Sequence, residues 1–276
     1  KGMKIMYHQH HEDRLQYPLK RIEKGFERIS WEQATEEIAA KLKDIIAKNG
    51  PRSYAYMGGG GQGCHFEAAS GMTLLKAIGS RYYYNALGQE LTGLFWAYGR
   101  GTGKQYKFAI PDEHNCDMFV GIGWNGMVSH QIPRAPLFLR EFAKNPDKLL
   151  VIIDPRKTET AEIADIHLAI KPGTDALLTK AMISIVINEG WSDDEYMKNH
   201  INGYEEIKSW FAGFDSKAAV EFCGLDYEQV KEVCHQLRVR KACCHPDLGV
   251  YMNRHSTLTT YLEIILFAIT GNICVP

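Results

Sequence analysis

The sequence predicts an α/β fold with mostly parallel strands, and two features of the chain support this class. Short apolar segments recur, and each leads through a polar or glycine-rich turn into a predicted helix. The segment Leu149–Ile153, Leu-Leu-Val-Ile-Ile, is continuously apolar, as expected of a strand that helices cover on both faces. With the strand and helix before it, this segment makes a unit of roughly 30 residues, the size of a right-handed βαβ crossover.

The first third of the chain is expected to form one long helix and one strand–helix pair. The first thirty residues are polar and turn-rich. Ser30 is the predicted N-cap of a helix that runs to about Lys48, with Gln33 in the position of a capping box. Gly50-Pro51 ends this helix. The elements expected next are a strand at 53–57, a glycine loop at 58–61 and a helix at 66–78.

The rest of the chain repeats the pattern of strand, turn and helix. A strand at 117–121, a loop at 124–126 and a helix at 133–144 lead to the strand at 149–153. A long apolar helix is expected at 176–188, followed by mostly helical chain to about residue 240. The last predicted elements are a strand at 248–252, a turn at 253–256 and a helix at 258–269.

Composition favours a globular protein that binds a small ligand. The 276 residues are 45% hydrophobic, which is enough for a sizeable core. The formal net charge is −1 and no long run of one sign occurs, so the electrostatic case for nucleic acid or an anionic membrane surface is missing. The most apolar late stretch, 261–269, carries Glu263 and is far shorter than the roughly 20 residues of a membrane-spanning helix. We therefore expect neither nucleic-acid binding nor direct membrane insertion.

The cysteines are expected to be reduced thiols. Seven occur, an odd number without a C-x-x-C pair, which argues against a disulfide framework and against a zinc or iron–sulfur site within the chain. Cys243 and Cys244 are followed by His245, and we interpret them as buried small residues at a domain crossing rather than as metal ligands.

The turns after the strands are the places where we expect a ligand. In open parallel sheets ligands bind beyond the carboxyl ends of the strands, so the loops at 58–63, 123–130, 154–160 and 253–257 should line one crevice. Consecutive glycines at 58–61 let backbone N–H groups approach a phosphate, although a flexible turn is the alternative interpretation. Their order is not G-x-G-x-x-G, so the ordinary dinucleotide fingerprint is absent.

Two acids are the strongest individual candidates. Asp154 follows a predicted strand, where an acid can accept hydrogen bonds from ribose hydroxyls, and Arg156 beside it offers charge for phosphate. Asp175 follows Pro172-Gly-Thr174 in the first turn of a helix, where the helix dipole should keep it ionised and its two oxygens can accept parallel N–H bonds, such as those of guanine. The alternative is a helix N-terminus in which Thr174 is merely the N-cap.

Three segments carry a resemblance to a known family. They are RLQYPLKRIEKGFERISWEQATEEIA (14–39), DPRKTETAEIADIHLAIKPGTDALL (154–178) and GNICVP after the last helix. They resemble the molybdopterin oxidoreductases of the dimethyl sulfoxide reductase superfamily, over nearly the whole chain. The resemblance implies two Rossmann-like three-layer α/β/α units, one inserted into the other.

The resemblance also implies a cofactor, a bis(molybdopterin guanine dinucleotide) with molybdenum or tungsten. In that family the PGTD acid recognises guanine, while the DPR acid and nearby threonines hold ribose and phosphates. Carried over, these roles fall on Asp154, Arg156, Thr158, Gly173, Thr174 and Asp175. Further segments that match dinucleotide or pterin contacts contain Gly58, Gly59, Gly60, Gly61, Gly123, Trp124, Asn125, Asn253, Arg254 and Thr257.

By the same resemblance the chain is an internal fragment. Lys1-Gly2 matches the pair that follows the last cysteine of a [4Fe–4S] cluster, so the cluster would precede Lys1, and Lys1 would lie between cluster and pterin. A C-terminal β-barrel domain would follow Pro276. The expected parts are a remnant of the N-terminal domain at 1–29, a split nucleotide-binding domain at 30–105 and 246–276, and an inserted one at 106–245. We expect the isolated fragment to fold, to bind cofactor weakly or not at all and to be inactive.

One departure from the family concerns the metal ligand. Family members usually supply cysteine, selenocysteine, serine or aspartate from the loop that here would span 85–93, and the alignment puts Leu91 at that position. Glu90 could supply an oxygen to the metal or act as acid/base. Otherwise the metal carries only pterin sulfurs and a non-protein oxygen, or a residue other than Leu91 takes the ligand position. Cys64-His65 lies in the preceding loop and is not expected to be the ligand.

The resemblance favours an oxidoreductase that moves an oxygen atom or a hydride equivalent on a small substrate, with an electron-transfer subunit or redox carrier as partner. A non-redox hydratase or hydroxytransferase on the same cofactor is the first alternative. A respiratory-complex subunit without cofactor is less consistent with Asp154, Thr158 and Asp175, and a plain NAD-dependent dehydrogenase lacks its glycine spacing. A cytoplasmic location is favoured, with the periplasm as the alternative if an export signal precedes Lys1.

Overall fold

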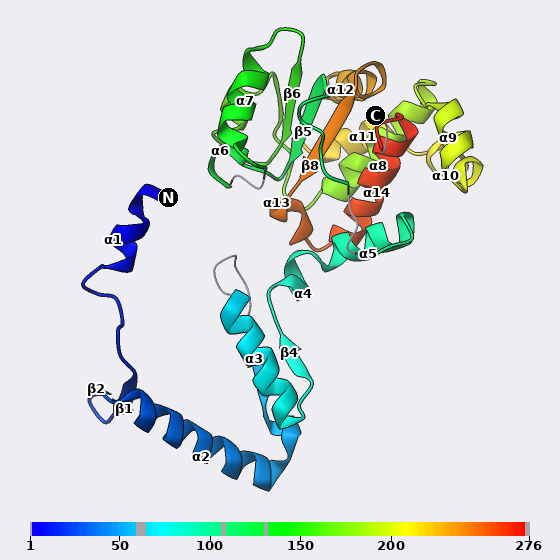
Figure 1. The fold of residues 1–276 in the computed structure, drawn as a ribbon. Coiled ribbons are helices and arrows are strands. Elements are labelled where there is room, and N and C mark those ends of the chain that lie inside the picture. The colour runs from blue at the N-terminus through cyan, green and yellow to red at the C-terminus, as the bar shows by residue number, and fades with distance from the viewer. Residues whose placement is uncertain (1, 59–64, 106–108, 130–131, 274–276) are drawn as a thin grey trace. The chain divides into compact units, whose positions relative to one another are not determined.

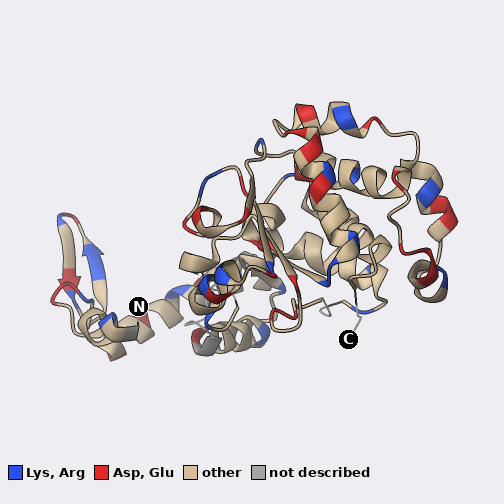
Figure 2. Cartoon of the chain, turned by 90° about the horizontal axis from the view of Figure 1, so that it is seen from above, with Lys and Arg blue, Asp and Glu red and all other residues tan. Residues whose placement is uncertain are grey.

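The computed structural model describes residues 2–58, 65–105, 109–129 and 132–273. The chain forms two compact units, residues 1–86 and 87–276. In Figure 1 the ribbon of the first unit runs from blue to cyan, and that of the second from cyan to red. Lys and Arg are interspersed with Asp and Glu over helices and turns of both units (Figure 2). In the described part of the chain, the helices are too short or too polar to cross a membrane.

The first unit contains two small sheets and two longer helices. Its elements are a 3₁₀ turn η1 (Gly2–Lys4), α1 (Ile5–Gln9), β1 (Leu19–Ile22), β2 (Gly25–Arg28), α2 (Trp31–Asn49), a 3₁₀ turn η2 (Pro51–Ser53), β3 (Ala55–Met57), α3 (His65–Ile78) and β4 (Tyr82–Tyr84). Strands β1 and β2 form an antiparallel hairpin that the sequence did not predict, because both strands are largely exposed and lack an apolar face. Strands β3 and β4 pair in parallel.

Helix α2 begins at the predicted cap. The Ser30 hydroxyl oxygen accepts a hydrogen bond from the backbone N–H of Gln33 at 3.1 Å, which satisfies one of the free amides of the first turn. The Gln33 side-chain amide instead donates to Glu37 Oε1 at 3.0 Å, so this side chain points along the helix rather than back to the cap. Gly50 ends the helix with a φ of 77°, a left-handed value that favours glycine.

The second unit is a three-layer α/β/α structure. Its sheet has the order β7-β6-β5-β8, and all three strand pairs are parallel. The elements are α4 (Leu87–Glu90), α5 (Thr92–Gly101), β5 (Met118–Ile122), α6 (Gly126–Ser129), α7 (Ala135–Lys144), β6 (Leu149–Ile153), η3 (Ala161–Ile163), β7 (Ile166–Leu168), α8 (Asp175–Asn188), α9 (Asp194–His200), α10 (Tyr204–Phe211), α11 (Ser216–Phe222), α12 (Tyr227–Val239), β8 (Ala242–Pro246), α13 (Leu248–Tyr251) and α14 (Ser256–Ile269). The predicted α/β class with parallel strands is confirmed.

Strand β5 lies in the interior of this sheet, and every one of its residues is buried. Because side chains alternate across a strand, Phe119 packs with Leu139 and Phe142 of α7 on one face, whereas Met118 and Val120 pack with helices α8, α12 and α14 on the other. Figure 1 shows these helices on opposite sides of the strands. The two apolar clusters fix the sheet between its helix layers.

Two local predictions were wrong. The segment 248–252, predicted as a strand, is helix α13, and the last strand is β8 at Ala242–Pro246. Its sequence, Ala-Cys-Cys-His-Pro, has no β-branched residue, whereas Val250 and Tyr251 favour a strand by propensity. The segment 85–93, predicted as a loop, contains α4 and the start of α5. The other predicted helices and strands occur within about three residues of their expected limits.

The first testable consequence concerns Gly126. A side-chain carbon at this position would overlap the fully buried ring of Trp124 and lie 2.8 Å from Leu139 Cδ1. Gly126→Ala should therefore lower the free energy of unfolding by about 1–3 kcal/mol, measured by urea unfolding. Gly213→Ala is the control, because nothing lies within 4 Å of the added carbon, and it should change stability by less than about 0.5 kcal/mol. Equal effects of the two substitutions would contradict the packing described here.

Candidate functional site

The turns after β5, β6 and β8 emerge at one edge of the sheet, because these neighbouring strands are parallel. The chain leaving β5 continues into α7 on one face, and the chain leaving β8 continues through α13 into α14 on the other. Adjacent strands whose connections diverge to opposite faces mark the point where ligands bind in open parallel sheets. The edge beside β5 and β8 is therefore the candidate site.

Two glycines bring the backbones of these turns into direct contact. A side-chain carbon on Gly249 would lie 2.6 Å from the Gly123 carbonyl oxygen, and one on Gly123 would lie 3.0 Å from the Gly249 carbonyl carbon. Gly123 also has a φ of 58° and donates its N–H to the Ile153 carbonyl at 2.9 Å. Glycine is required at both positions by this approach.

Asp175 and Asn253 join two segments that are far apart in sequence. Asn253 Nδ2 donates to Asp175 Oδ2 at 2.7 Å, which ties the first residue of α8 to the turn before α14. Burial raises the pKa of Asp175 above its usual range, hydrogen bonds from its own backbone N–H and from Asn253 oppose the shift, and the charge of Asp154 adds to it. The pKa of Asp175 is therefore raised, whereas the dipole at the helix N-terminus alone would lower it.

The other predicted residues of the segments 154–160 and 173–174 mostly shape the turns. Asp154 Oδ1 accepts from the backbone N–H of Arg156 at 2.8 Å, and Arg156 itself is exposed. Thr158 is almost fully buried, and its hydroxyl accepts from the Ala161 N–H at 3.2 Å. Thr174 is buried as well and donates its hydroxyl to the Lys171 carbonyl at 2.7 Å, beside Gly173 with a φ of 82°.

A second polar network connects the turn after β5 with the segment after β6. Asn125 Nδ2 donates to Glu159 Oε2 at 2.7 Å, and the Thr160 hydroxyl donates to Asn125 Oδ1 at 2.8 Å. The Met127 N–H in turn donates to Thr160 at 3.1 Å. Asn125 was predicted, whereas Glu159 and Thr160 were not, although both lie in the same polar segment as Thr158.

The remaining predicted residues are distributed over both units. Trp124 has a fully buried side chain that packs against Phe119 and His245, so only its backbone could reach a ligand. Arg254 and Thr257 are exposed beside Asn253. Glu90 is half-buried at the end of α4, and Gly93 closely approaches Ser256 and Thr257 at the start of α14. Gly58 belongs to the first unit, where its N–H donates to the Tyr84 carbonyl at 3.1 Å; Lys1, Gly59, Gly60 and Gly61 lie outside the described residues.

Asp247 was not predicted as a site residue, because the last strand was expected at 248–252 rather than at Ala242–Pro246. Asp247 directly follows β8, donates its N–H to the Ile122 carbonyl at 3.0 Å, and has a pKa raised by burial. An acid directly after a strand is the signal that would have identified it.

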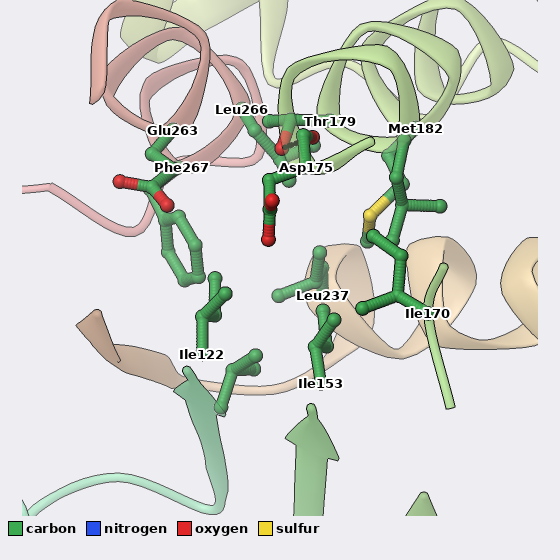
Figure 3. Close-up of a pocket in the computed structure, with 12 residues that line it drawn as sticks. Ile122, Ile153, Ile170, Asp175, Thr179, Met182, Leu237, Glu263, Leu266 and Phe267 are labelled. Carbon is green, nitrogen blue, oxygen red and sulfur yellow. Dashed lines mark hydrogen bonds between the residues drawn. The ribbon is translucent and has the colours of Figure 1, made fainter. Parts of the chain in front are cut away.

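A small cavity lies below Asp175, between α8, α14 and the ends of β5 and β6 (Figure 3). Asp175 points into it, and Glu263 of α14 also lines it, among mostly apolar side chains. Glu263 is 5% exposed, and neither of its carboxyl oxygens has a hydrogen-bond partner among the described residues. Burial, with a smaller contribution from the charge of Asp175, raises the pKa of Glu263 to about 8.

The raised pKa makes stability depend on pH. Between the usual pKa of 4.5 and about 8, the folded protein keeps the Glu263 proton while the unfolded chain loses it, so the stability contribution falls as pH rises, by up to roughly 1.4 kcal/mol per pH unit. Glu263→Gln should remove this decline, and urea unfolding across that pH window should show its stability increasing relative to the wild type. Glu221→Gln changes an exposed residue, so its free energy of unfolding should follow the same pH dependence as the wild type. The same pH dependence in Glu263→Gln would contradict the assignment of the effect to Glu263.

The chain is similar to several molybdopterin enzymes. A family model for molybdopterin oxidoreductase matches residues 14–250. Acetylene hydratase of Syntrophotalea acetylenica is 32% identical over 95% of this chain and 36% of that protein. The F420-dependent formate dehydrogenase subunit alpha of Methanocaldococcus jannaschii is 30% identical over 96% of this chain and 38% of that protein. The chain thus spans little more than a third of the length of these relatives.

A solved structure supports the same relationship. Acetylene hydratase from Pelobacter acetylenicus superimposes with a TM-score of 0.77 and 28% sequence identity, over 96% of this chain and 37% of that one. The match of the family model to most of the chain, together with this shared fold, shows that the chain belongs to the molybdopterin oxidoreductase family, within the dimethyl sulfoxide reductase superfamily.

Proposed function

We propose that the protein containing this chain is a molybdenum or tungsten oxidoreductase that binds bis(molybdopterin guanine dinucleotide) and transfers an oxygen atom or a hydride equivalent on a small substrate. The observation that carries the proposal is that Asp175 is hydrogen-bonded to Asn253 and lies near enough to Asp154 to be affected by its charge, beside the edge of the sheet where the turns after the parallel strands emerge. Family membership supports the pterin part of the cofactor.

The chemistry of Asp175 fits recognition of guanine. A carboxylate can accept hydrogen bonds from N1–H and the 2-amino group of guanine at the same time. Asn253 holds Oδ2 at 2.7 Å and so restricts the orientation of the carboxylate, while further lone pairs stay available for a base. Burial and the charge of Asp154 raise the pKa of Asp175. N–H donors of a bound ligand would favour its ionised form, and hydrogen bonds to a carboxylate are stronger than those to a neutral acceptor.

The neighbouring residues fit the sugar and phosphates of such a nucleotide. Asp154 is half-buried beside Asp175 and can accept from ribose hydroxyls with the lone pairs that the Arg156 N–H does not use. The exposed guanidinium groups of Arg156 and Arg254 can pair with phosphate oxygens. The direct packing of Gly123 against Gly249 fixes the position of the turn after β5 at this edge of the sheet.

The bound group would supply the redox chemistry through its metal. The residues of this chain would hold and orient it, and Glu90 is proposed as an oxygen donor or acid/base near the metal. We also propose a [4Fe–4S] cluster on another segment of the protein, with Lys1 between cluster and pterin, and an electron-transfer subunit or carrier as partner. The packing of α14 against α5 supports the proposed return of 246–276 to a split nucleotide-binding domain, and α14 also packs against α8 of the segment 106–245.

A second candidate function is hydration without net redox change. It is favoured by the similarity to acetylene hydratase in both sequence and structure. It is also consistent with Leu91, which cannot ligate a metal and which precedes the first turn of α5. In this case Glu90, half-buried at the end of α4, would be the candidate for moving a proton.

The cofactor proposal predicts a specific loss in Asp175→Asn. The amide would place N–H groups against the donors of guanine, so nucleotide retention should weaken roughly ten- to hundredfold. We would purify the intact protein from a host that makes the cofactor, measure molybdenum and tungsten, and quantify GMP released by acid. Asp215→Asn is the control, because Asp215 also lies at a helix N-terminus, as the N-cap of α11, where asparagine still caps.

Each outcome of this experiment has a distinct meaning. Metal with GMP in the wild type and in Asp215→Asn, but not in Asp175→Asn, supports the proposal. Metal without GMP in the wild type would contradict the dinucleotide form. Full GMP in Asp175→Asn would exclude Asp175 as the guanine contact.

The two candidate functions are separated by their need for an electron acceptor. An oxidoreductase should oxidise formate, or reduce an oxygenated substrate, only when an artificial electron acceptor or donor is present. A hydratase should convert acetylene to acetaldehyde without an added acceptor. Acceptor-independent turnover would therefore contradict the leading proposal and support the second candidate.

A further inference from the structure

Two cysteines that are distant in the sequence have their sulfur atoms in close contact. Cys116 Sγ and Cys243 Sγ lie 3.1 Å apart, although the residues are 127 positions apart along the chain. Cys116 is 4% exposed in the turn just before β5, and Cys243 is the second residue of β8. Both belong to the apolar cluster on the α7 face of the sheet, next to Phe119.

The separation fits a dithiol better than a metal site. Two cysteines bound to one tetrahedral zinc would hold their sulfurs about 3.7 Å apart, farther than these two. In addition, the described residues contain no group of three or more potential metal ligands. A disulfide requires about 2.05 Å, so the sulfurs need to approach by about 1 Å.

The required movement can come from the turn that carries Cys116. Strand β8 is fixed by its ladder with β5, in which Cys243 is level with Phe119. Cys116 instead precedes the strand, and its backbone carbonyl accepts from the flexible side chain of Lys148 at 2.9 Å. The next residue, Asp117, is held by backbone hydrogen bonds to Lys241 at 2.8 Å and Leu149 at 2.9 Å, so the movement would be confined to Cys116 and the turn before it and would leave the sheet pairing intact.

The other cysteines of the described chain have different surroundings. Cys244 follows Cys243 and therefore points to the opposite face of the sheet, where burial, with a smaller contribution from Glu263, raises its pKa. Cys223 and Cys234 are fully buried, and their sulfurs lie 3.8 Å from the carbonyl oxygens of Thr174 and Met182. The thiol pair is thus distinguished by geometry from these three cysteines.

We propose that Cys116 and Cys243 form a redox-active pair that closes to an intramolecular disulfide. With a low-molecular-weight disulfide as oxidant, one cysteine thiolate attacks it, forming a mixed disulfide and releasing one small thiol. The second cysteine thiolate then displaces the other small thiol, so two protein thiols are oxidised and one small disulfide is reduced to two thiols. The close contact with Cys116 and burial both raise the pKa of Cys243, which keeps it protonated at neutral pH and makes the exchange slow.

The disulfide would connect the two points where the chain runs into and out of the segment 106–245. Cys116 lies near the beginning of this segment and Cys243 near its end. The bond would form towards the edge of the sheet opposite the turns at Gly123, Asp154 and Asp247, so it would stabilise the fold without touching the candidate site. Because it closes a long loop, we expect it to raise the unfolding midpoint by on the order of 10 °C.

The experiment is a mass-spectrometric comparison of the intact protein after prolonged incubation with oxidised or reduced glutathione. Free thiols are then alkylated, and the protein is digested without reduction. The expected product is a peptide containing Cys116 linked to the peptide containing Cys243, lighter than the two reduced peptides by two hydrogen atoms and released by reductant. The oxidised protein should also unfold at the higher temperature.

Substitutions identify which sulfurs react. Cys116→Ser and Cys243→Ser should abolish both the linked peptide and the rise in midpoint. Cys244→Ser and Cys234→Ser, which keep the pair, should retain both. A link through Cys244, or an oxidised wild type that lacks the Cys116–Cys243 peptide with or without glutathione adducts, would overturn the proposal. The wild-type comparison stands even if a variant fails to fold.

Discussion

The pairing of β5 is the constraint on which the rest of the second unit depends. Every residue of this strand is buried, so its backbone N–H and C=O groups can be satisfied only by the neighbouring strands. This fixes the register with β6 on one side and β8 on the other. The register in turn brings the turns that follow these strands to one edge, and the alternation of side chains assigns α7 to one face and α8, α12 and α14 to the other.

The electrostatics of the candidate site follow from this arrangement. Asp175 and Glu263 line one cavity below the edge, and Asp154 is near enough to affect Asp175. Burial raises the pKa of Asp175 and of Glu263; the charge of Asp154 raises the first further, and the charge of Asp175 the second. Such a group of carboxyl groups is suited to a ligand rich in N–H donors, because hydrogen bonds from the ligand offset the cost of burying negative charge. A base that offers donors meets that requirement, whereas a carboxylate ligand would aggravate it.

Parts of this structure could be predicted from the sequence and parts could not. A continuous apolar run predicted β6, because strands buried on both faces leave such runs, and the repeated pattern of strand, turn and helix predicted β5. Asp154 and Asp175 stood out by their positions after a strand and at a helix start. The meeting of Asp175 with Asn253 depends on tertiary packing across 78 residues, which local patterns do not encode. Strand β8 escaped prediction because its pairing with β5, rather than its own propensity, makes Ala-Cys-Cys-His-Pro extended. Glu263 was recognised only as a charge in an apolar stretch, since its isolation from partners is a property of the folded core.

The backbone contact between Gly123 and Gly249 has a mechanical consequence for the site. The turn after β5 and the first turn of α13 are in direct backbone contact at Gly123 and Gly249, with the Val250 side chain packed beside them. We therefore expect a displacement of α13 to move the turn that carries Asn125, and the hydrogen bond of Asn125 to couple this movement to Glu159. On this expectation the two turns shift together, and a ligand meets one coupled surface rather than two independent loops.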